Sequence, residues 1–139
     1  MKRIIDYKAT EPRRTFNVAI STPITTSPTR LGLASLRVMI PTNSSNNTVE
    51  LVATVGVRGV TGISQILFRV FRDGKQIFST QSGIESAGSE QNYTVSFQAI
   101  DRNLAAGTHK YVLTAENRTS GTRADVVGPV SFSALVIKN

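Results

Sequence analysis

A glycine stands at every third position of residues 56–62, GVRGVTG, a spacing that could serve phosphate binding or a collagen-like repeat. A phosphate-binding loop lies between a buried strand and a helix, usually with Lys-Ser or Lys-Thr following, whereas ISQILFRVFR follows here. Collagen needs many consecutive triplets rich in proline, and this stretch contains no proline. The motif is therefore interpreted as the end of one strand, a turn and the start of the next.

Residues able to do acid–base, nucleophilic or metal chemistry are few. The sequence has no cysteine, which excludes thiol nucleophiles, zinc–thiolate sites and disulfides. His109 is the only histidine; it starts a predicted strand, no motif places a second ligand near it, and we expect it to face solvent. The nine Asp and Glu residues are scattered without the spacing of a general acid and its base. We therefore expect no enzyme activity, no catalytic residues, no metal and no cofactor.

The formal net charge of +7 could steer the protein to a polyanion. The basic residues are spread along the chain, however, and are concentrated only in residues 1–14. Most aromatic residues occupy inward positions of predicted strands; the exception is the segment in which Arg69 and Arg72 alternate with Phe68 and Phe71. This pattern favours a solvated or interface strand face over a nucleic-acid track, so nucleic acid is not the expected partner.

The elements that must position these residues are predicted to be strands. Hydrophobic residues alternate with period two in VELVATVGV and YTVSFQAI, and again in HKYVLTAEN and GPVSFSALVI. In QILFRVFRDGKQIFSTQ, two β-rich runs flank an Asp-Gly pair that favours a tight hairpin turn. The 139 residues fit one domain, for which we predict an all-β fold, an antiparallel β-sandwich of jelly-roll type. The predicted core comprises Val49, Leu51, Ala53, Val55, Phe68, Val70, Val95, Phe97, Tyr111, Leu113 and Phe132.

The N-terminal third is less regular. Both TFNVAIS and LGLASLRVMI are expected to be extended, and a short helix over residues 31–39 is the alternative for the second. Residues 1–14 are predicted to form an extended basic arm, and residues 15–139 a single β-sandwich domain. The arm could lie along an edge of its own sheet or along that of a neighbouring subunit, and its alternation puts Ile4 and Asp6 on one side and Ile5 and Tyr7 on the other. The candidate assembly residues are Ile4, Ile5, Tyr7, Arg69 and Phe71.

The N-terminal residues and the lengths of the apolar runs indicate where the protein is expected to be located. The longest apolar runs fall far short of the ~20 residues that a membrane-spanning helix needs, so no membrane insertion is expected. Because MKRIID does not read as a secretory leader, we expect synthesis in the cytosol without a signal peptide.

Three segments carry a resemblance to a known family: MKRIIDYKAT, VELVATVGVRGVTGISQILFRVFRDGKQIF, and TVSFQAIDRNLAAGTHKYVLTAENRTSGTRADVVGPVSFSA. Together they resemble exosporium protein C-type spore-surface proteins of Bacillus relatives. The resemblance implies a structural protein made in the mother cell and deposited on the spore surface, in the exosporium or coat, as a homo-oligomer that also contacts other spore-surface proteins. It brings no catalytic residues. The alternative from another class is a basic β-domain that binds a polyanion such as nucleic acid, including a capsid-like jelly roll.

Overall fold

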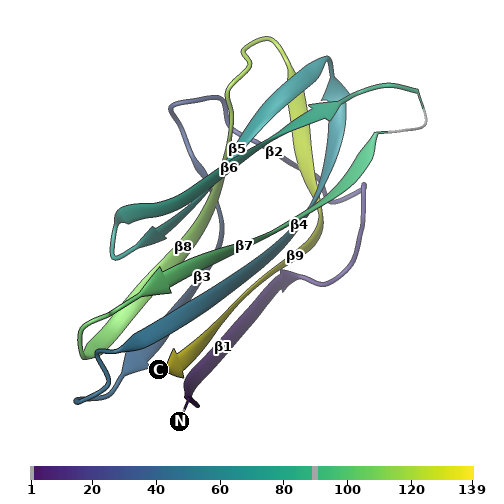
Figure 1. Ribbon diagram of the computed structural model, residues 1–139. Helices are drawn as coiled ribbons and strands as arrows, with labels where there is room; N and C mark the ends of the chain where they lie inside the picture. The colour runs from purple at the N-terminus through teal and green to yellow at the C-terminus, as the bar shows by residue number, and fades with distance from the viewer. Residues whose placement is uncertain (1, 89–90) are drawn as a thin grey trace.

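The computed structural model describes residues 2–88 and 91–139, which form two antiparallel sheets packed face to face (Figure 1). One sheet, called sheet A here, has the order β1-β9-β4-β7 with the short β2 beside β9; the other, sheet B, has the order β3-β8-β5-β6. The bounds are β1 Arg3–Arg13, β2 Thr22–Pro23, β3 Leu31–Ile40, β4 Asn47–Thr61, β5 Ile63–Arg72, β6 Lys75–Glu85, β7 Asn92–Arg102, β8 Gly107–Asn117 and β9 Arg123–Lys138.

The connections cross between the two sheets almost every time. From β3 onward the chain alternates between sheets B and A, except at the β5–β6 hairpin, which stays within sheet B. Strands far apart in sequence therefore become neighbours, as β1, β9 and β4 do, and the two termini lie at the same end of the sandwich (Figure 1). This is the strand arrangement of a jelly roll, so the predicted fold class is confirmed.

The core lies between the sheets and follows the alternation seen in the sequence. In β4, Val49, Leu51, Ala53 and Val55 are at most 1% exposed, while their neighbours in the strand point outward. The predicted core residues are buried, except Val95 and Phe97, which are half-buried. Both lie in β7, the last strand of sheet A, where one flank has no neighbouring strand to cover it.

Of the three glycines in residues 56–62, only Gly62 lies in a turn. Gly62, at φ +67°, makes the predicted turn between β4 and β5. Gly56 and Gly59 are both inside β4, which continues to Thr61 through most of the segment where the strand was predicted to end. A Cβ on Gly56 would collide with the carbonyl group of Gly128, and one on Gly59 with that of Glu85, so these glycines let neighbouring backbone pass close by.

The N-terminal third differs most from expectation. Residues 31–40 are the predicted strand β3, but residues 15–21 are not extended; they contain a turn. Half-buried Arg13 holds this loop, because its guanidinium donates hydrogen bonds to the carbonyls of Val126, Asn17 and Ile20. The arm itself is strand β1 and pairs with β9 of the same chain, which is the first of the two arrangements considered for it.

Replacing Gly56 with alanine should lower the free energy of unfolding by about 2–4 kcal/mol, because backbone atoms of β9 would have to move away from the new methyl group. Gly32→Ala in β3 is the matched control, since a Cβ there meets nothing within 4 Å. Urea unfolding of both variants checks this; equal stability of Gly56→Ala and Gly32→Ala would contradict the close approach.

Candidate functional site

The three predicted assembly residues of β1 do not share one side. The register with β9 shifts between Ile4 and Asp6, so Ile5 is the extra residue of a β-bulge. Ile4 and Tyr7 consequently both face outward, 66% and 59% exposed, while Ile5 packs against the core. The prediction that Ile5 and Tyr7 face the same way is therefore wrong, and the signal for the bulge was absent from the simple alternation.

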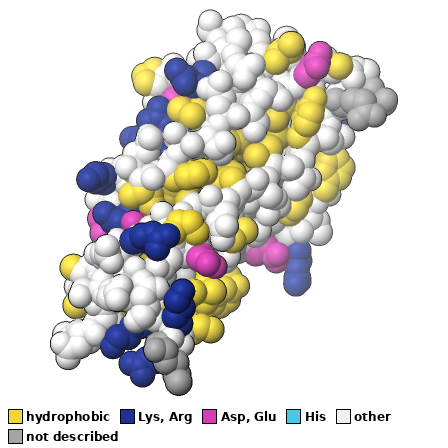
Figure 2. Space-filling view, in the orientation of Figure 1, with side chains coloured by type: hydrophobic (Ala, Val, Ile, Leu, Met, Phe, Trp, Pro, Cys, Tyr) yellow, Lys and Arg dark blue, Asp and Glu magenta, His cyan; other side chains and the backbone are white. Residues whose placement is uncertain are grey.

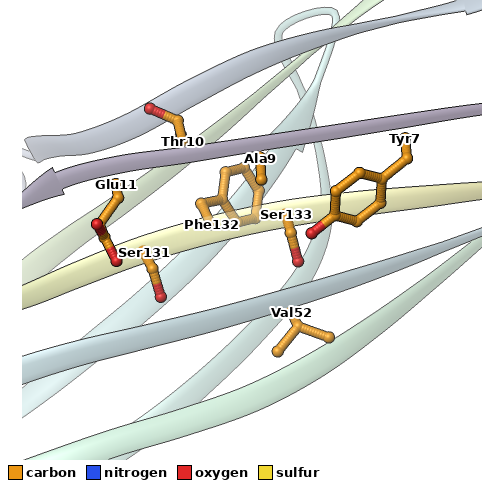
Figure 3. Close-up of a pocket in the computed structure, with 8 residues that line it drawn as sticks. All are labelled: Tyr7, Ala9, Thr10, Glu11, Val52, Ser131, Phe132 and Ser133. Atoms are coloured by element: carbon orange, nitrogen blue, oxygen red, sulfur yellow. The ribbon is translucent and has the colours of Figure 1, made fainter.

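Tyr7 belongs to a larger surface, the outward side of sheet A, called the outer face here. Val52 in β4 and Ile100 in β7 contribute to it and are 44% and 45% exposed. A shallow hollow of about 380 Å³ lies on this face (Figure 3). Its lining contains no histidine, and the Glu11 carboxylate is paired with Arg14 and not with Ser131 or Ser133. The hollow is lined by Tyr7, Ala9, Thr10, Glu11, Val52, Ser131, Phe132 and Ser133.

Arg69 and Phe71, the other two predicted assembly residues, lie on the outward side of sheet B and are engaged within the subunit. Arg69 Nε lies 3.1 Å from Glu116 Oε1 as an ion pair without hydrogen-bond alignment, and the Ser27 hydroxyl donates to Glu116 Oε2. Phe71 is 9% exposed beneath the Arg30 guanidinium, which lies 4.5 Å from the ring centroid. Phe71 is therefore covered within the subunit, and Arg69, whose side chain is 30% exposed, is held by an ion pair.

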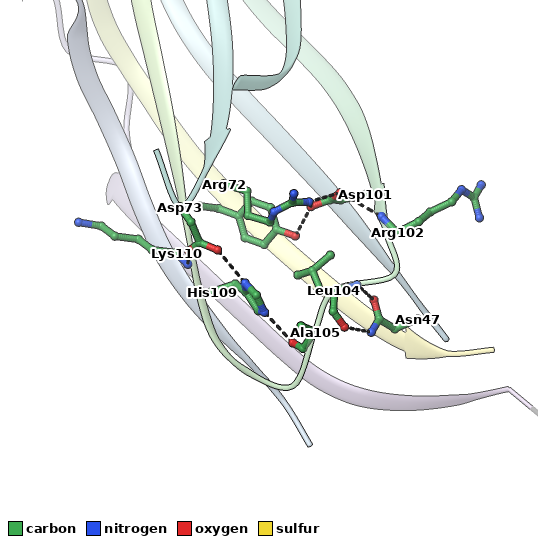
Figure 4. A network of polar contacts seen from close by, with 10 residues as sticks. Asn47, Arg72, Asp73, Asp101, Arg102, Leu104, Ala105, His109 and Lys110 are labelled. Carbon is green, nitrogen blue, oxygen red and sulfur yellow. Dashed lines mark hydrogen bonds and ion pairs between the residues drawn. The ribbon is translucent and has the colours of Figure 1, made fainter. Parts of the chain in front are cut away.

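A buried polar cluster ties the two sheets together at one end of the sandwich (Figure 4). Asp101 of β7 is bound by the Arg72 guanidinium, whose Nη1 is 2.6 Å from both carboxylate oxygens, and by the Tyr111 hydroxyl at 2.8 Å. Burial, and then the Asp101 carboxylate, raise the pKa of Tyr111, so this hydroxyl stays a proton donor. The cluster joins β5, β7 and β8 and acts as a structural fastening.

His109 lies beside this cluster (Figure 4). The prediction that it faces solvent is wrong, because its side chain is only 16% exposed. Its Nδ1 is 2.7 Å from Asp73 Oδ2 and its Nε2 is 2.7 Å from the Ala105 carbonyl oxygen. Both partners are acceptors, so the doubly protonated imidazolium satisfies both contacts. Burial lowers the pKa of His109, but the bonds to Ala105 and Asp73 outweigh burial and the net shift is upward. Neither ring nitrogen is free to serve as a base or a metal ligand.

The described residues lack both the clustered ligands of a metal site and a helix that could span a membrane. Within residues 2–88 and 91–139, no group of three His, Asp or Glu side chains is placed to hold a metal ion. Across the same residues, no helix is long and apolar enough to cross a membrane.

Comparisons with known proteins show similarity in fold but not in sequence. No family model matches the chain, and no curated protein matches it. The structure of infectious bursal disease virus, Gx strain, superposes with a TM-score of 0.56 at 7% identity, over 99% of this chain and 32% of that one. T=1 particles derived from infectious bursal virus give a TM-score of 0.53 at 10% identity, over 98% of this chain and 37% of that one. The chain thus spans about a third of the length of these solved chains, and the likeness shows the jelly-roll fold.

The His109 contacts predict a pH dependence of stability. Because the folded-state pKa of His109 is raised, its contribution is complete below its usual value of 6.5 and is lost as pH rises through the folded-state pKa. The free energy of unfolding should therefore fall above pH 6.5, by less than about 1.4 kcal/mol per pH unit for one proton. His109→Ala should remove this slope. Urea unfolding from pH 6 to pH 9 tests it, and an unchanged slope in the variant would contradict the assignment.

At low pH, the stability that the Asp73–His109 contact provides depends on the ionisation of Asp73. The backbone N–H of Lys110, followed by His109, lowers the pKa of Asp73 below its usual 3.8. Its contribution is therefore complete above pH 3.8 and is lost as pH falls through the lowered pKa, outside the range of the His109 experiment.

Proposed function

We propose that this chain is a non-enzymatic structural subunit that assembles with copies of itself into a protein shell. The observation that carries the proposal is the outer face of sheet A, where Ile4, Tyr7, Val52 and Ile100 are 44–66% exposed. These side chains are spread over one sheet face among polar residues such as Glu50, the register partner of Ile100, and they offer apolar contacts that another copy would cover. The histidine and the buried carboxylates are meanwhile bound inside the subunit, which leaves them no evident catalytic task.

The fold similarity supports the same proposal. One of the similar solved structures is described as T=1 particles derived from infectious bursal virus, so in that protein the fold occurs in a particle. This chain shares the fold at 10% identity, and shell formation by this chain is an extension of that likeness.

For the location of the shell we propose the spore surface, in the exosporium or coat, on the strength of the sequence resemblance alone. A fluorescent fusion produced during sporulation of the native host should surround the spore. Fluorescence that stays diffuse in the mother cell would reject this location while leaving shell formation elsewhere open.

A second candidate function, polyanion binding, is supported by one feature of sheet B. Arg37 of β3 and Lys110 of β8 are register partners, and both are exposed on the outward side of the sheet. Like charges directly opposite each other are destabilising, and a bound anion would relieve the repulsion. The feature involves two cations, fewer than a nucleic-acid track would require.

Salt separates the two candidate functions. Self-assembly through apolar contacts should persist from 50 mM to 500 mM NaCl, because screening weakens charge–charge attraction and not apolar packing. Binding of a mixed-sequence single-stranded oligonucleotide should be weak at 50 mM and absent at 500 mM. Light scattering and fluorescence anisotropy measure the two. Tight oligonucleotide binding together with a monomeric protein would favour the polyanion candidate instead.

A matched pair of variants locates the contact used in assembly. Val52→Glu places a charge on the outer face of sheet A, and Met39→Glu places the same charge at a position of similar exposure, 54% against 44%, on sheet B. We expect Val52→Glu, whose charge would be buried at the contact, to abolish assembly through the outer face and Met39→Glu to leave it intact. Equal behaviour of the two variants would contradict assembly through the outer face.

A further inference from the structure

The sandwich has two open sides, and they are built differently. On one side the outer strands β1 and β3 lie next to each other; on the other side β6 and β7 do (Figure 1). Each of these strands has a neighbour on one flank only, so each carries a row of backbone groups that its own sheet does not pair.

The β1–β3 side carries the features that discourage pairing with another chain. Asp6 Oδ2 accepts a hydrogen bond from the backbone N–H of Met39 in β3 at 3.0 Å, and Lys8 lies 3.5 Å from the same carboxylate. Strand β1 also contains Pro12 and two register shifts against β9. Charged side chains, proline and bulges are the usual devices by which edge strands avoid a new partner.

Strand β7, on the other side, has none of these features over most of its length. It pairs with β4 from Asn92 to Arg102 without a register shift. Between Asn92 and Ile100 it has no charged residue, no proline and no glycine. A long, regular and uncharged edge strand is a ready template for a further strand.

The phase of the β4–β7 ladder shows which groups are open. The Gly59 N–H donates to the Gln91 carbonyl at 2.9 Å, and antiparallel strands bond at every second residue from there. The odd-numbered residues of β7 therefore bond to β4, and the even-numbered residues direct their N–H and C=O groups to the open flank. The even-numbered residues between the two ends of β7 are Thr94, Ser96, Gln98 and Ile100, whose side chains are all exposed.

An apolar strip runs beside this flank. Phe78 of β6 and Phe97 of β7 stack with ring centroids 5.5 Å apart, yet both are only half-buried. Figure 2 shows hydrophobic side chains in a diagonal band over β6, β7 and β4. A partner strand along β7 would cover this strip as well as the open backbone groups.

We propose that β7 pairs antiparallel with β7 of a second copy of this chain, about a two-fold axis at Phe97, giving one continuous sheet across both copies. The proposal rests on the proposed self-assembly and specifies its first contact. An antiparallel strand can pair with itself about a two-fold axis, so one surface supplies both halves of the interface. Copies of a chain with net charge +7 repel each other, and the uncharged span of β7 is where they can approach.

The register follows from the open groups. With Phe97 on the axis, Thr94 lies opposite Ile100 of the second copy and Ser96 lies opposite Gln98, which allows about eight main-chain hydrogen bonds. The two Phe97 rings then meet on the core side of the sheet, and Arg102 lies opposite Asn92 rather than opposite another Arg102.

A matched pair of proline variants tests the pairing. Ser96→Pro removes an N–H that points to the open flank, so it should block the second strand while the monomer keeps its fold. Ser35→Pro is the control, because Ser35 is an exposed serine in the edge strand β3. The N–H of Met39 points to the free flank of β3, and the register with β8 is regular from Ser35 to Met39, so the N–H of Ser35 points to the same flank. Sedimentation velocity should show at least tenfold weaker dimerisation for Ser96→Pro and unchanged dimerisation for Ser35→Pro.

The other outcomes distinguish this inference from the proposed function. If Ser96→Pro associates as the parent does, β7 pairing is refuted while self-assembly stands; a parent that is monomeric at every concentration refutes both. If weakening follows Gln81→Pro in β6 instead, the interface lies on the other sheet and the inference fails. If Ser96→Pro does not fold, Gln98→Lys keeps the backbone N–H, adds a charge at the interface and should show the same tenfold loss, and normal dimerisation of that variant would overturn the pairing.

Discussion

A β-sandwich that does not close into a barrel leaves a row of backbone N–H and carbonyl groups on each outer strand, and those groups need partners or protection. In this chain the β1–β3 side is protected from within, since Asp6 accepts the N–H of Met39 and β1 is bulged and charged. On the β6–β7 side the Tyr93 hydroxyl contacts the backbone N–H and carbonyl of Glu85 in β6, but no proline, bulge or charged side chain protects the span of β7 from Asn92 to Ile100. This difference between the two sides is the reason to expect a partner at β7 and not at the N-terminal strand.

The interior explains why the open side can be tolerated in a stable subunit. Strand β4 is paired on both flanks, by β9 and β7, and its inward side chains are almost fully buried. Gly56 lets the backbone at Gly128 pass close to this central strand, and the Asp101–Arg72 pair ties the outer strand β7 to sheet B. The flank of β7 can therefore remain unpaired without loosening the centre of the sandwich.

The sequence predicted most of the fold because one buried sheet face imposes a period of two on each strand. What it could not predict depended on partners distant in the chain. The bulge at Ile5, the hydrogen bond from Arg13 to Val126 and the contact of His109 with Asp73 all involve partners that no local pattern identifies. For the site, the sequence indicated that residues 1–14 are extended, but the simple alternation put Ile4 and Tyr7 on opposite sides and missed that both face outward. The open flank of β7 could not be anticipated, because which strand ends a sheet is decided by topology.

Hydrogen exchange of the β7 amides measures the central claim most directly. In dilute monomeric protein, the amides of Thr94, Ser96, Gln98 and Ile100 should exchange rapidly, because their N–H groups point to the open flank. In concentrated, assembled protein the same four amides should become protected together, while that of Ser35 in β3 exchanges equally fast in both states. Rapid exchange of the four β7 amides in the assembled protein would contradict the account.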